Sequence, residues 1–133
     1  MSSINRPLAG PELVFNLQSQ LAELRQDEAY TRSGRAGRTL TKSGRLRLVL
    51  VALAGGHNVG TQQADSPLTV HVLSGNISFR SEGGVHHLRA GEVQYFGPGD
   101  AHDIRATEES ALLLTLSAVG DDFLPELSES GGA

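Results

Sequence analysis

The side chains of this 133-residue chain that are best suited to acid/base or metal chemistry are five histidines. The chain has no cysteine, which excludes disulfides, thiolate nucleophiles and cysteine-ligated zinc or iron–sulfur centres. An unperturbed imidazole titrates near neutral pH, so each histidine is a candidate acid, base or metal ligand. What they can do depends on which of them the fold brings together. They are His57, His71, His86, His87 and His102.

Other chemical motifs are weak or absent. Glu108 and Glu109 are adjacent, so their side chains would diverge in a strand and not form a catalytic pair. The glycine-rich stretches lack the strand-to-helix setting and the lysine of a phosphate-binding loop, and no G-x-S-x-G element occurs. The net charge of −4 and the lack of a nucleic-acid-reading motif lead us to expect no nucleic-acid partner.

Length and composition exclude several classes of protein. The length favours one domain. The chain has 16 glycines and only 5% aromatic residues, which favours a fold with many chain reversals over a helical bundle. The longest apolar run, residues 48–54, is far shorter than the roughly 20 residues that a membrane helix needs. Without cysteines or a signal-peptide pattern, we expect a cytoplasmic protein with no membrane partner.

The elements that position the histidines begin with a helical segment. Residues 1–12 are rich in Ser, Gly and Pro and are typical of a loose arm. Leu17, Leu21 and Leu24 have helical spacing, which predicts a helix over about 16–28 with Asn16 as its N-cap. Residues 30–45 have no apolar periodicity and predict an irregular connection or a short edge strand near 39–42. We expect residues 1–44 to be an arm, helix and basic connection, 45–119 a β-barrel, and 120–133 an acidic tail.

After residue 44 the pattern indicates strands throughout. Short runs with alternating or continuous apolar residues are separated by turn residues, among them a hairpin signal at 74–76. Six to eight short strands without an intervening helix predict an all-β antiparallel sandwich or barrel. The runs cover residues 45–53, 67–80, 84–106 and 111–117.

The glycine spacing carries a family resemblance. Gly56 is followed after five residues by Gln62, then by Ala64, Leu68 and Gly75. This frame resembles the first motif of the cupin family, G-x5-H-x-H-x3,4-E-x6-G. Gln62, Ala64 and Leu68 stand where the family has two histidines and a glutamate.

A second segment resembles the second cupin motif, G-x5-P-x-G-x2-H-x3-N. Gly91 is followed after five residues by Gly97, then by Gly99, and His102 falls at the histidine position. Ala106 replaces the final asparagine. The resemblance implies a jelly-roll β-barrel, also called a double-stranded β-helix, with one N-terminal helix and a pocket between two sheets.

The same resemblance implies that the usual metal site is degenerate. Three of the four ligand positions hold Gln62, Ala64 and Leu68, which leaves His102 alone. A divalent ion needs three or four convergent N or O donors. We therefore expect no cofactor and no resident metal, and the family's metal chemistry does not carry over.

The histidines then divide by position. By the resemblance, His102 points into the pocket, where it could act as an acid, a base or a hydrogen-bonding group. His86 shares strand parity with Leu88 and is expected inward, whereas His87 points away. His71 lies on the face opposite Leu68, where a subunit interface is expected. An atypical metal site could use His102, His57, His86 and Gln62.

Three hypotheses follow. The leading one is metal-independent binding of a small organic molecule in the barrel pocket. The second is an enzyme that uses His102 as acid or base, or the atypical metal site above. The third is a structural or regulatory dimerisation module, and a homodimer is expected under all three. The predicted pocket lining is Gln62, Ala64, Leu68, Val70, Phe79, Phe96 and His102.

Overall fold

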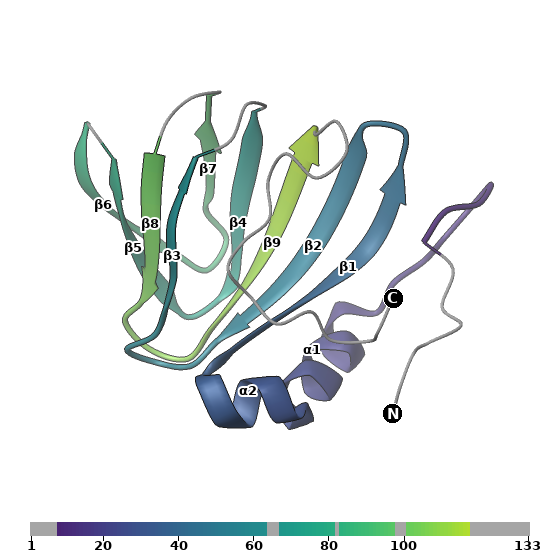
Figure 1. Ribbon diagram of the computed structural model, residues 1–133, viewed down its shortest axis with the longest axis horizontal. Coiled ribbons are helices and arrows are strands. Elements are labelled where there is room, and N and C mark those ends of the chain that lie inside the picture. Colours follow the sequence, from purple (N-terminus) through teal and green to yellow (C-terminus); the bar gives the residue numbers. More distant parts are fainter. Residues whose placement is uncertain (1–7, 64–66, 82, 98–100, 118–133) are drawn as a thin grey trace.

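The computed structural model describes residues 8–63, 67–81, 83–97 and 101–117. Within them, two antiparallel sheets face each other and two short helices lie against the outer side of the larger sheet (Figure 1). The larger sheet has the order β1-β2-β9-β4-β7 and the smaller one β3-β8-β5-β6. The predicted jelly-roll architecture is confirmed. No helix in the described ranges is long and apolar enough to cross a membrane.

The elements occur in the following order. The helices are α1 (Leu17–Gln26) and α2 (Glu28–Ser33). The strands of the larger sheet are β1 (Arg35–Ser43), β2 (Leu46–Leu53), β4 (Leu68–Ser74), β7 (Val93–Phe96) and β9 (Ser110–Ser117). Those of the smaller sheet are β3 (Asn58–Gln63), β5 (Asn76–Ser81), β6 (Gly84–Arg89) and β8 (Ala101–Ala106).

The helical region differs from the sequence prediction in one respect. Asn16 caps α1 as expected, with its side chain accepting a hydrogen bond from the Ser19 backbone N–H at 3.0 Å. Asp27 ends this helix and caps a second one, because its carboxylate accepts from the Ala29 N–H at 2.9 Å. The second helix, α2, ends at Gly34 in a left-handed conformation. The predicted single helix is therefore two.

The barrel begins earlier than residue 45. Residues 35–43 form β1, which pairs along its length with β2, so most of the expected irregular connection is a sheet strand. Its outward side is covered by α1, and buried Arg38 bonds Glu23 and Gln20 of that helix at 2.6 and 2.7 Å. The expected alternative of an edge strand near 39–42 is thus confirmed, and the strand is longer, covering 35–43. Buried Arg38 between Ala36 and Leu40 interrupts the apolar pattern, which explains why the rest of the strand was not predicted.

The expected hairpins are present where the described residues include them. Gly75 joins β4 to β5 at φ 85°, and Gly91 lies between β6 and β7 at φ 91°. Both are left-handed conformations that favour glycine. Gly99, to which we assigned a similar role, lies outside the described residues.

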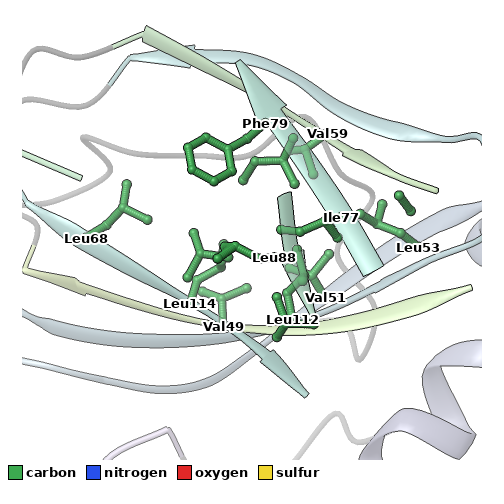
Figure 2. Close-up of a cluster of buried hydrophobic side chains, with 14 of the residues drawn as sticks. Val49, Val51, Leu53, Val59, Leu68, Ile77, Phe79, Leu88, Leu112 and Leu114 are labelled. Carbon is green, nitrogen blue, oxygen red and sulfur yellow. The ribbon is translucent and has the colours of Figure 1, made fainter. Parts of the chain in front are cut away.

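Two apolar clusters hold the layers together. One fills the space between the sheets, where Figure 2 shows Phe79 and Val59 facing Leu68 and Leu114 across the interior. The other joins the helices to the outer face of β1, β2 and β9 through Leu24, among others. Strand alternation thus gives the larger sheet two apolar faces, one toward the interior and one toward α1 and α2.

Candidate functional site

The positions that correspond to the cupin metal ligands lie where β3, β8 and β4 approach one end of the sandwich (Figure 1). In the register of the smaller sheet, Gln62 stands opposite His102. The side chains at both positions, and Ala64 entirely, lie outside what the structure describes. Leu68, at the family's glutamate position, is only 2% exposed and stands opposite Phe96 in β7. A hydrocarbon in this place offers a metal no donor.

Aromatic rings from both sheets meet beside this position. Phe79 of β5 and Phe96 of β7 are both buried and pack edge to face, with ring centroids 5.0 Å apart. On the backbone, Phe79 is opposite Ile104, which is two residues from His102 along β8. The position of His102 is therefore about 7 Å along the strand from the level of Phe79.

His86 adds a third ring to this group. It is opposite Phe79 in the β5–β6 pairing, and the two rings stack with centroids 5.1 Å apart and planes 20° apart. His86 nevertheless remains exposed, so its ring lies between buried Phe79 and the solvent. Its parity with buried Leu88 had indicated this side of the strand. We call Phe79, Phe96 and His86 the aromatic cluster.

One polar residue on the interior side was not identified from the sequence. Gln94 is opposite Val70, which is fully buried, and it shares the parity of Phe96 in β7. It is half-buried, and its amide nitrogen donates to the Tyr95 carbonyl at 3.2 Å. The alternation of β7 could have predicted this position, because Gln94 and Phe96 are two residues apart and therefore lie on the same side of the strand.

His57 lies away from the aromatic cluster. Its carbonyl accepts a hydrogen bond from the Ala106 N–H, at the end of β8 opposite to His102. Its imidazole packs against Gly34 at the end of α2, and Nδ1 lies 3.3 Å from the Gly55 carbonyl oxygen. His57 and His86 belong to segments separated by three strand spacings, about 14 Å. The convergence that the atypical metal site required of these two residues does not occur.

The remaining predicted residues are distributed between the two sides of the larger sheet. Val70 faces the interior beside Leu68 and belongs to the same cluster. His71 lies on the outer face, half-buried, as the alternation of β4 predicts. Among the described residues, no three His, Asp or Glu side chains form a group that could hold a metal ion. Of the four positions that correspond to the cupin metal ligands, only Leu68 has a described side chain, and it offers a metal no donor.

Comparisons with known proteins address the fold. No family model and no curated protein match the sequence. A conserved protein with a double-stranded β-helix domain from Klebsiella pneumoniae aligns with a TM-score of 0.70 and 16% identity, over 86% of this chain and 96% of that chain. A cupin superfamily protein from Desulfitobacterium hafniense gives 0.67 and 16%, over 82% and 94%.

A third similar structure is an RmlC-like cupin from Shewanella frigidimarina, with a TM-score of 0.63 and 19% identity over 68% of this chain and 81% of that chain. At such identities the likeness concerns the fold and not the activity. It agrees with the strand order and with the glycine frame of the sequence. The chain therefore has the cupin fold.

Proposed function

We propose that this protein is a small member of the cupin family that binds a small organic molecule between its sheets without a metal ion. The observation that carries the proposal is the aromatic cluster beside the positions that correspond to the cupin metal ligands. A ligand pocket is mostly apolar with a few placed polar groups. Here the apolar side consists of buried Leu68, Phe79 and Phe96, and exposed His86 is a polar group on the solvent side.

The stacking geometry defines the class of ligand. One face of the His86 ring packs on Phe79, and the residue as a whole is exposed. A second planar group can stack on an imidazole that is already held by such a contact. We therefore expect a flat, mostly apolar molecule with one or two polar substituents. Gln94 is an additional hydrogen-bonding group on the interior side.

Enzymatic acid/base catalysis at His102 is the second candidate in this site. Its support is the register, which puts position 102 opposite Gln62 and close to the level of the aromatic cluster. Conversion of a bound ligand that is lost in His102→Ala while binding is retained would favour this candidate.

The binding proposal is tested by titration with 8-anilinonaphthalene-1-sulfonate, a planar apolar probe, followed by its fluorescence. We expect saturable binding that weakens several-fold in His86→Ala. The matched control is His87→Ala, because His87 is the neighbouring exposed residue on the other side of β6. Equal affinity of wild type and His86→Ala would contradict the proposal, as would an equal loss in both variants.

The absence of a metal requirement is tested separately. Untagged protein is incubated with iron, manganese, nickel and zinc, dialysed and measured by elemental analysis. We expect no stoichiometric metal, because Leu68 contributes no donor at the third ligand position. One equivalent of any of these metals would overturn the metal-independent form of the proposal.

A further inference from the structure

The outward side of the smaller sheet carries exposed arginines. Arg80 of β5 follows buried Phe79, and Arg105 of β8 follows buried Ile104. Successive side chains of a strand point to opposite faces, so both arginines point away from the interior, and both are exposed. The two described helices pack on the larger sheet and do not cover this face (Figure 1). These arginines are thus on the opposite side of the smaller sheet from the proposed ligand site.

Ser78 of β5 lies at the centre of this outward face. In the pairing of β5 with β8 it stands opposite Arg105, and in the pairing of β5 with β6 it stands opposite His87. Arg80 is two residues further along β5 on the same face, which makes it a diagonal neighbour of Arg105. Such positions are roughly 7–8 Å apart, so both long side chains can reach a group above the Ser78 hydroxyl. We call Ser78, Arg80 and Arg105 the outer basic cluster, which His87 borders.

No described carboxylate pairs with either arginine of the outer basic cluster. The arginines of α1 and α2, in contrast, are both ion-paired. The acid nearest to the cluster in the register is Asp103, which stands opposite Arg80. Its carboxylate accepts a hydrogen bond from Asn58 at 3.5 Å, and β3, which contains Asn58, is on the far side of β8 from β5. The described residues thus leave the two guanidinium groups without an ion pair, and a bound anion would relieve their repulsion.

We propose that the outer basic cluster binds the phosphate group of a small, soluble phosphomonoester. A planar guanidinium group donates two parallel hydrogen bonds to a phosphate, and two such groups from adjacent strands can hold one phosphate between them. Ser78 is half-buried beneath them and offers its hydroxyl as a further donor. The phosphate of a monoester has three free oxygens for these three side chains, whereas a carboxylate has two.

The charge balance of the protein favours a small ligand over an anionic polymer or surface. The chain has a net charge of −4, so a nucleic acid or an anionic membrane is repelled as a whole, whereas a small ion responds to the local charges. The outer basic cluster also contains only three side chains. They suffice for one phosphate group but not for a row of phosphates along a nucleic-acid backbone.

The main test is a titration of isotope-labelled protein with inorganic phosphate at constant ionic strength, followed by NMR. We expect saturable shifts of the backbone amide signals of Ser78 and Arg105, because these positions are next to the bound ion. Arg105→Gln should raise the dissociation constant roughly tenfold, since it removes charge-assisted hydrogen bonds. The matched control is Arg45→Gln, because Arg45 is exposed in the β1–β2 turn and its loss changes the net charge equally. Absence of saturable shifts at these amides, or equal affinities of the two variants, would overturn the proposal.

Two further measurements distinguish the sources of such a phosphate. Glycerol phosphate, a soluble phosphomonoester, should shift the same amide signals and bind at least as tightly as inorganic phosphate. Vesicles of phosphatidylcholine and phosphatidic acid present the same phosphomonoester on a membrane, and the protein should not sediment with them. Cosedimentation that Arg105→Gln abolishes would assign the site to a lipid headgroup and overturn the soluble ligand.

The outer basic cluster is expected to act independently of the ligand site between the sheets. Inorganic phosphate and Arg105→Gln should both leave the affinity for 8-anilinonaphthalene-1-sulfonate unchanged, because the two sites are on opposite sides of the smaller sheet. Competition between phosphate and this probe would contradict a separate site. Circular dichroism of each variant verifies that the chain remains folded.

Discussion

Phe79 joins the core of the sandwich to the proposed ligand site, so its removal tests the packing on which the site depends. The ring is 2% exposed and contacts Phe96 and His86 at centroid distances of 5.0 and 5.1 Å. Truncation of a buried phenylalanine to alanine lowers the free energy of unfolding by 3–5 kcal/mol, so we expect Phe79→Ala to cost about 4 kcal/mol. That is a large part of the roughly 5–15 kcal/mol typical of a domain.

Equilibrium urea unfolding followed by circular dichroism measures this loss through the transition midpoint and slope. His86→Ala is expected to cost no more than about 1 kcal/mol, because an exposed ring loses little buried area. In the variant that carries both Phe79→Ala and His86→Ala, the loss of unfolding free energy should differ from the sum of the two single losses by about 0.5–1.5 kcal/mol, the value of one aromatic pair. If Phe79→Ala is too unstable to measure, Phe79→Leu completes the same cycle.

A loss of less than about 2 kcal/mol in Phe79→Ala would contradict this packing, because the ring would then not be a core residue. Strict additivity of the two substitutions would contradict the contact between the rings. In that case the stacked rings would be neighbours without an interaction, and His86 would not be held in position for a planar ligand. Loss of probe binding in His86→Ala could then not be attributed to stacking.

Two further results are expected from the structure. Gly75 and Gly44 both have positive φ, but only at Gly75 would a Cβ collide with the backbone at Glu109 and Ser110. Gly75→Ala should therefore lower the urea midpoint well beyond Gly44→Ala, and equal shifts would contradict the close approach. Burial, and next the Glu109 charge, raise the pKa of Tyr30 above 10.0. An acid with a raised folded pKa loses stability as pH rises through its unfolded value, so the stability advantage of wild type over Tyr30→Phe should shrink above about pH 10. A constant difference across this range would contradict it.

The sequence could predict those parts of the fold that depend on local signals. Asn16 before a leucine stripe predicts the start of α1, and Gly75 predicts the β4–β5 hairpin. Both signals concern a few consecutive residues and need no knowledge of the partner surface. The glycine frame added the fold class, because its resemblance to the cupin motifs implies a two-sheet jelly roll.

Strand β1 was predicted only as one of two alternatives and over part of its length, and helix α2 was not predicted, for different reasons. The outward side of β1 is buried through Arg38 and its bonds to α1, so the buried residue has a type that normally indicates exposure. Helix α2 has six residues, too few to show a 3.6-residue period. Its local signals, Asp27 before it and Gly34 after it, also fit the end of the preceding helix and a turn in a connection.

The candidate site also has one residue whose position could be predicted from the sequence and one whose position could not. Parity within one strand predicted that His86 lies on the side of Leu88, and the ring stack with Phe79 follows from the pairing of β5 with β6. The position of His57 could not be predicted, since its ring packs on Gly34, a residue 23 positions earlier that ends a helix the sequence did not reveal. Loop residues depend on such contacts more than strand residues do.

The leucine at the former glutamate position connects stability to function. Leu68 is buried in the cluster between the sheets, and burial of a leucine side chain contributes about 1.5–3 kcal/mol. A carboxylate there would lose its hydration and would need a compensating partner in the interior. Leu68 thus contributes to the apolar interior and offers a metal no donor. Phe79 and Phe96 are buried in the same cluster, and the ligand site proposed above lies at its margin, where His86 is exposed.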